Sequence, residues 1–192
     1  MDYSVAQPSE ARDADRVSST TGGEYRGFCF WVFDVCASIL LAEMATVAGE
    51  TPAAERSAWL ADLEHQLRVN AIVGIGIPLD EWCDGHEEQF LALVTEAARR
   101  LAGRDPTTAQ QAAAWIVLDG SPILWRGRDP VDTEPIVAFA DAMAAIIRGT
   151  YPQARTASGG SSASPAGSGR SRCASESRSF LLLARRDEGG TR

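Results

Sequence analysis

The segment from Phe28 to Met44 constrains the fold more than any other part of this chain, because nearly all of its residues are apolar. Only two acidic residues, Asp34 and Glu43, interrupt it. The segment is shorter than the roughly 20 apolar residues that a membrane-spanning helix needs. In a helix over 24–50 its apolar side chains would point in every direction, which is typical of a helix inside a protein core. We therefore expect a central helix and no membrane partner.

Two amphipathic helices are predicted next along the chain. The first should begin with Thr51 as its N-cap and end at Gly74. The second should begin at the capping-box pair Asp84 and Glu87 and end at Gly103. Apolar residues recur along both segments at helical spacing. These are Leu60, Leu63, Leu67 and Ala71 in the first, and Phe90, Leu93, Val94, Ala97 and Leu101 in the second.

The stretch after Asp105 and Pro106 has two interpretations. It predicts a fourth helix that ends near Gly120. The residues 115–125 could instead form a β-hairpin, with Asp119 and Gly120 in a tight turn. We favour the helix.

The clearest amphipathic pattern extends from Asp132 or Thr133 to Arg148 and predicts a last helix. We find no convincing alternating strand. The sequence therefore predicts an all-α fold, a single compact bundle of about five helices over residues 25–152. The expected apolar face of the last helix consists of Ile136, Val137, Ala140, Met143, Ala144 and Ile147.

Both ends of the chain are expected to be disordered. Residues 1–24 carry few bulky apolar side chains, so they cannot bury enough surface to offset the entropy of ordering. Residues 153–192 form a low-complexity tail rich in Ser, Gly and Arg, with one short apolar cluster at 180–183. We predict a disordered N-terminal arm and a disordered C-terminal tail.

The charge distribution limits the class of partner. Residues 25–152 carry 18 acidic side chains against 9 arginines, a net charge of −9, whereas residues 153–192 carry 3 against 7, a net charge of +4. An acidic domain argues against nucleic acid and favours basic partners, cationic ligands or simple solubility. The four cysteines lack C-x-x-C spacing and no cleavable signal opens the chain, so a cytoplasmic location is expected. The sequence is also compatible with a homo-oligomer.

Asp34 is the first candidate site residue, because an ionisable group on an apolar helix is costly unless it is paired. As a ligand-binding carboxylate it would work with Trp31, its neighbour on the predicted helix, and with Arg126 and Arg128, which flank Gly127 in a turn. The structural alternative is that Asp34 accepts hydrogen bonds from one of these arginines or from a tryptophan N–H.

The second candidate is a metal site formed by Asp80, Asp84 and His86. Two carboxylates one helical turn apart suit Mg²⁺, and Cys83 and His86 together with Asp80 or Glu87 would suit Zn²⁺. Asp80, Glu81 and Asp84 resemble the aspartate-rich motif of terpene cyclases, but the second metal motif of that family is not visible and the predicted domain is too short for that fold. The alternative, which we favour, is that these acids cap a helix and no cofactor is needed.

No catalytic set of known pattern is evident, so the sequence favours a protein that acts by binding a protein partner or a small ligand. The alternative is a small enzyme or biosynthetic accessory protein, with an interhelical pocket around Asp34 and a dependence on Mg²⁺ through Asp80 and Asp84.

Overall fold

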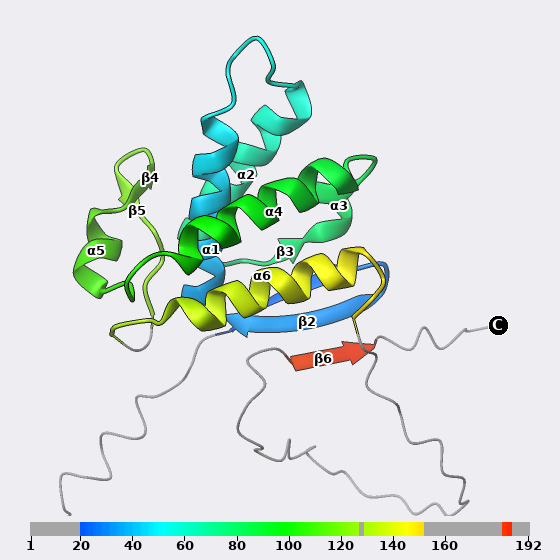
Figure 1. Ribbon diagram of the computed structural model, residues 1–192. Helices are drawn as coiled ribbons and strands as arrows, with labels where there is room; N and C mark the ends of the chain where they lie inside the picture. Colours follow the sequence, from blue (N-terminus) through cyan, green and yellow to red (C-terminus); the bar gives the residue numbers. More distant parts are fainter. Residues whose placement is uncertain (1–19, 127–128, 152–181, 186–192) are drawn as a thin grey trace, which may run out of the picture.

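The computed structural model describes residues 20–126, 129–151 and 182–185, and its fold is mixed α/β (Figure 1). The predicted all-α bundle is therefore wrong, although the helices form most of the fold. In chain order the elements are β1 (Thr20–Tyr25), β2 (Phe28–Phe33), α1 (Asp34–Gly49), α2 (Ala58–Val73), β3 (Ile77–Pro78), α3 (Leu79–Cys83), α4 (Glu87–Ala102), α5 (Ala109–Ala114), β4 (Ile116–Leu118), β5 (Ser121–Pro122), α6 (Thr133–Ile147) and β6 (Leu182–Arg185).

The larger sheet has the strand order β3-β1-β2-β6. Strand β1 pairs antiparallel with β2 and parallel with β3, and β2 pairs antiparallel with β6. Strand β1 begins at Thr20, inside the segment predicted as an arm, and β6 lies inside the predicted tail. The rest of the arm (1–19) and of the tail (153–181 and 186–192) lies outside the described residues.

The start of the predicted central helix is a β-hairpin instead. Arg26 and Gly27 both have positive φ, 47° and 78°, as the tight turn between paired strands requires. In β2, Phe30 and Val32 are buried whereas Trp31 between them is 38% exposed. This alternation follows from the two-residue period of a strand.

The packing of this hairpin requires glycine at position 23. Gly23 lies opposite Phe30 in the register, and a Cβ on Gly23 would fall 2.1 Å from the Phe30 ring. The ring therefore occupies the space that a side chain would need, and it reaches Phe139 of α6 with ring centroids 6.1 Å apart. This contact fixes α6 against the inner face of the sheet.

Helix α1 is the central helix expected from the apolar window, but it begins at Asp34 and not ten residues earlier. It packs against α2, α4 and α6, and most of its side chains are buried. The apolar faces of α4 and α6 point into the same core, as predicted, with Val137 only partly buried.

The helix ends differ from the predictions at two N-termini. Helix α2 begins at Ala58 with Ser57 as its N-cap, whose hydroxyl accepts from the Leu60 N–H, and not at Thr51. Helix α4 is preceded by His86, so Asp84 is not its cap. The predicted ends are correct at Gly74, which has a φ of 61°, and at Gly103.

The hairpin, and not the helix, is correct for the stretch before Pro122. Strands β4 and β5 pair antiparallel around Asp119 and Gly120, with φ of 46° and 79°. Only the short α5 precedes them, and it starts from a capping box formed by Thr108 and Gln111. The Asp-Gly turn pattern outweighs helix propensity here.

Candidate functional site

Asp34 sits at the N-terminus of α1 and is 3% exposed. Its Oδ1 accepts a hydrogen bond of 2.7 Å from the Thr21 hydroxyl, which also lies 3.2 Å from the carbonyl oxygen of Gly74. The guanidinium Nη1 of Arg126 is 3.6 Å from Oδ2. The positive end of the α1 dipole also favours a carboxylate at this position. Asp34 therefore connects β1, α1 and the segment after β5.

The other residues predicted around Asp34 separate in the fold. Arg126 approaches Asp34, as both the ligand-binding hypothesis and the structural alternative expected. Trp31 pairs with Gly22 and projects from the exposed side of β2, because residue 31 lies on a strand and not on a helix. Arg128 lies outside the described residues. Arg126 is thus the member of the predicted ligand set that the structure places beside Asp34, and the ligand-binding role of the set stays a prediction.

Asp80 supports the turn of the first hairpin. Both of its carboxylate oxygens accept from the backbone N–H of Arg26, at 2.9 Å each. The Arg26 guanidinium bonds Glu87 at the start of α4, with 3.0 Å between Nη2 and Oε1. Since the hairpin turn would otherwise leave this N–H to water, Asp80 and Glu87 hold the turn against α3 and α4.

Asp84 and His86 lie in the loop between α3 and α4. Asp84 is exposed. The His86 ring stacks on Trp59, with centroids 4.4 Å apart and planes at 19°, and its Nδ1 is 2.7 Å from Oε1 of Gln89. Across residues 20–126 and 129–151, no group of three or more His, Cys, Asp or Glu side chains is placed to hold a metal ion. The Mg²⁺ and Zn²⁺ sites stay predictions.

A second buried carboxylate, Glu43, lies in the middle of α1 and was not among the predicted site residues. It is 1% exposed, and its Oε2 pairs with Nη2 of Arg104 at 2.8 Å. Its Oε1 lies 4.0 Å from Nη1 of Arg100 and accepts no hydrogen bond from the described residues. Arg104 also lies over the Trp115 ring, 5.6 Å from its centroid. The sequence could have indicated Glu43 as a buried, paired carboxylate, because it interrupts the apolar segment Phe28 to Met44 in the same way as Asp34.

Arg100, which lies near Glu43, also belongs to an ion-pair network on the surface of α4. Glu96 accepts from Arg99 at 2.7 Å and from Arg100 at 2.8 Å, and Arg100 also forms a two-point pair with Glu50. The hydrogen bonds from Arg99 and Arg100 lower the pKa of Glu96 to about 2. Glu96 and Arg100 thus form an ion pair one helical turn apart on α4.

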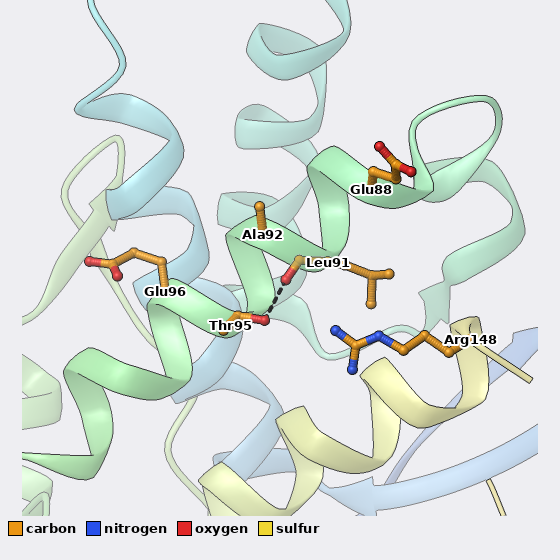
Figure 2. A pocket seen from close by; sticks show the side chains of 6 residues that line it. All are labelled: Glu88, Leu91, Ala92, Thr95, Glu96 and Arg148. Atoms are coloured by element: carbon orange, nitrogen blue, oxygen red, sulfur yellow. Dashed lines mark hydrogen bonds between the residues drawn. The ribbon is translucent and has the colours of Figure 1, made fainter. Parts of the chain in front are cut away.

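A shallow groove of about 480 Å³ runs between α4 and the end of α6 (Figure 2). The Arg148 side chain extends toward Leu91 and Thr95, while Glu88 and Glu96 point away from one another. The Thr95 hydroxyl donates 2.7 Å to the Leu91 carbonyl of its own helix. Because Glu96 is held by Arg99 and Arg100, this groove does not bring a catalytic pair together.

A second hollow, of about 420 Å³, lies on the outer face of the sheet. We use "outer face" for Gly22, Glu24, Cys29 and Trp31, together with Ile75, which follows α2. Trp31 is 38% exposed and Ile75 is 79% exposed. Glu24 is the one charged residue among those lining the hollow. This face combines two exposed apolar side chains, Trp31 and Ile75, with a single negative charge.

The hollow also contains an unsatisfied acceptor from α2. Asn70 donates to the Gln66 carbonyl at 3.1 Å, but its own buried Oδ1 accepts no hydrogen bond from the described part of the chain. A buried carbonyl oxygen without a donor is costly unless a donor arrives from elsewhere. Because this oxygen is itself buried, it lies beneath the surface of the hollow and offers no contact to a partner there.

Searches with this chain give no family to which it can be assigned. No family model matches it, and neither the curated proteins nor the solved structures contain a significant match. Within the described residues, every helix is too short or too polar to cross a membrane. Function is therefore inferred from the surfaces described above.

Proposed function

We propose that this protein functions by binding a protein partner through the outer face of its sheet. The observation that carries the proposal is Trp31, which is exposed beside Gly22 on one side of a strand whose other side is buried in the core. Tryptophan in a partly hollowed, apolar surface is a common anchor at protein interfaces. Ile75, which also lines the hollow, adds a second exposed apolar side chain beside Trp31, as the apolar centre of a protein interface requires.

The negative net charge of the domain indicates which kind of partner it would attract. Residues 25–152 carry 18 acidic side chains against 9 arginines, a net charge of −9, and Glu24 lies on the outer face itself. A basic partner would be attracted by this field, whereas an acidic one would be repelled. We therefore propose a partner segment that is apolar, for contact with Trp31 and Ile75, and that has basic residues next to it.

Selection from random peptides tests the proposal even while the partner is unidentified. The full-length protein would be presented with a displayed library of random peptides, and the enriched sequences compared with those enriched by the Ile75→Asp variant. We expect apolar peptides with Lys or Arg to be enriched by the wild type and lost with Ile75→Asp, because a carboxylate would replace the exposed apolar contact.

The matched control is Ile116→Asp, since Ile116 of β4 is 51% exposed and lies outside the hollow. That variant should enrich the same peptides as the wild type. If no peptide distinguishes Ile75→Asp from the wild type and from Ile116→Asp, the outer face is not the binding surface and the proposal fails.

The alternative of an enzyme or accessory protein with a pocket at Asp34 gains no specific support. The two hollows described above are lined neither by Asp34 nor by Arg126. The Asp34 contacts to Thr21 and Arg126 are explained by the joining of three segments of the fold. That alternative stays a prediction from the sequence.

A further inference from the structure

Strand β6 completes the sheet from a distant part of the chain. Its residues Leu182–Arg185 pair with Phe28–Trp31 of β2, in the register Phe28↔Arg185, Cys29↔Ala184, Phe30↔Leu183 and Trp31↔Leu182. Residues 148–181 separate β6 from the last helix, and 152–181 of them lie outside the described residues. Without β6, this edge of β2 would present a row of unpaired N–H and C=O groups, which is a template for another strand.

We infer that the β2 edge is a strand-addition site, that Leu182–Arg185 is its built-in occupant, and that an extended apolar and basic segment of the partner replaces it. The inference rests on the proposed function and names how the partner binds and what competes with it. In strand addition, backbone hydrogen bonds supply the affinity and alternate side chains supply the specificity. Here those side chains would lie next to Trp31 and Cys29 of the outer face.

The sequence of the occupant agrees with the charge of the domain. Leucines at 181–183 are followed by Arg185 and Arg186, and residues 153–192 carry 7 arginines against 3 acidic side chains, a net charge of +4. In the register, Leu182 and Ala184 are opposite Trp31 and Cys29 of the outer face, and the basic residues follow at the end of the strand. A partner segment of the same pattern would satisfy the same edge.

Because β6 belongs to the same chain as β2, it competes strongly with a partner strand for the β2 edge. A strand on the same chain acts at an effective concentration of the order of millimolar, so it is a strong competitor even when its own affinity is low. A partner binds only the fraction of molecules whose edge is vacant, and its apparent affinity falls by that fraction. The full chain should therefore bind an added strand more weakly than a chain whose own strand cannot pair.

The first experiment disables the built-in strand in the full-length protein. The Leu183→Pro, Ala184→Pro double variant removes two consecutive N–H groups, and since alternate residues of a strand donate to opposite sides, one of them would have faced β2. The probe is a fluorescein-labelled peptide with the sequence of residues 178–188, and its anisotropy reports binding. We expect the double variant to bind the peptide at least about tenfold more tightly than the wild type.

Equal affinity for both proteins, or no binding to either, would overturn the inference. The control peptide carries glutamate in place of Arg185 and Arg186 and should bind the double variant more weakly. Failure of the inference is distinguishable from failure of the proposed function. Peptides selected with the wild type could still require Ile75 for binding and yet bind the wild type and the double variant equally. That result would contradict the strand-addition site at the β2 edge and leave the proposed binding through the outer face intact.

The second experiment locks the strand in place by using the register. Directly opposed residues of antiparallel strands have Cα atoms about 4.5–5.5 Å apart, which lies within the range for a disulfide. In a Cys173→Ser background, Ala184→Cys should form an intramolecular disulfide with Cys29 under mild oxidation. The oxidised protein should lose peptide binding, and a reductant should restore it.

The matched control is Leu183→Cys, because position 183 is opposite Phe30 and not opposite Cys29. It should form the disulfide much less readily. An oxidised Ala184→Cys protein that still binds the peptide would overturn the inference. A disulfide-linked dimer as the main product would also overturn it, because β6 would then be supplied by a second copy of the chain.

Discussion

The Thr21 hydroxyl donates a 2.7 Å hydrogen bond to the carboxylate of Asp34, and this bond joins the first strand to the first turn of the central helix. Both side chains are buried, each 3% exposed. Arg126 approaches the other carboxylate oxygen from the segment after β5. Asp34, which the sequence offered as a ligand-binding carboxylate, is thus the point at which three parts of the fold meet.

Removal of this bond should destabilise the protein. We expect Asp34→Asn and Thr21→Val each to lower the free energy of unfolding by about 1 to 3 kcal/mol, because a buried partner is left without its hydrogen bond. The double variant should lose less than the sum of the two single losses. Urea midpoints at constant slope measure these energies, with Thr20→Val as an exposed control on the same strand. Additive losses would show that the two residues are not coupled.

Gly23 should tolerate no side chain, whereas its neighbour Gly22 should. A Cβ at position 23 would lie 2.1 Å from the Phe30 ring, while a Cβ at position 22 would lie 3.5 Å from the Trp31 indole. We expect Gly23→Ala to cost about 1 to 3 kcal/mol or more, as overpacking of a core does, and Gly22→Ala to cost well below that. Thermal unfolding of both variants measures the difference. Equal melting temperatures would contradict the packing of Phe30.

The Glu43–Arg104 pair should show an asymmetry between its partners. Arg104 is 44% exposed at its side chain, so it can return to water when Glu43 is removed, whereas Glu43 is 1% exposed and cannot. Arg104→Ala should therefore destabilise the protein more than Glu43→Met, by about 1 to 3 kcal/mol. Chemical denaturation of the two variants decides this. A larger loss for Glu43→Met would mean that the carboxylate is stabilised independently of Arg104.

The Glu96 network predicts a dependence of stability on acid. Hydrogen bonds from Arg99 and Arg100 lower the pKa of Glu96 from 4.5 to about 2 in the folded protein. The contribution of the charged form is therefore present above about pH 4.5 and is lost as the pH falls toward 2. The stability difference between wild type and Glu96→Gln should be largest near neutral pH and should shrink in acid.

The control for this prediction removes the donors. In an Arg99→Gln, Arg100→Gln background, the added Glu96→Gln change should have little effect at any pH, because the hydrogen bonds that shift the pKa are already absent. Urea titrations at pH 7 and pH 3 give both comparisons. A difference between wild type and Glu96→Gln that stays constant with pH would contradict the network.

The helices were predictable because their apolar residues repeat at helical spacing and their ends carry glycine. Gly74 and Gly103 follow α2 and α4 as expected, and α6 starts next to Asp132. The first hairpin was not predicted, because the run from Phe28 to Phe33 is apolar throughout and hides the alternation of a strand. The aromatic and β-branched residues in that run, and the Gly27 before it, were the available signals.

Strand β1 and the binding face were harder to predict, for a physical reason. Gly22 and Gly23 lower the strand propensity of β1, and the need for them appears only when the Phe30 ring and the Trp31 indole are placed opposite them. Trp31 was named as a ligand-binding residue, but its expected partner Asp34 lies in the buried junction. The exposure of Ile75 depends on the turn between α2 and β3, which no local pattern specified.

Trp31 is the residue on which the proposed binding surface most depends, and one measurement tests its role. Isothermal titration calorimetry would compare the binding of a peptide selected on the wild type to the wild type, to Trp31→Ala and to the control Ile116→Ala. We predict that Trp31→Ala weakens binding by at least about 30-fold, as the loss of a central interface anchor worth about 2 kcal/mol does, and that Ile116→Ala binds like the wild type. Binding by Trp31→Ala with unchanged affinity and enthalpy would contradict the assignment of the outer face as the binding surface.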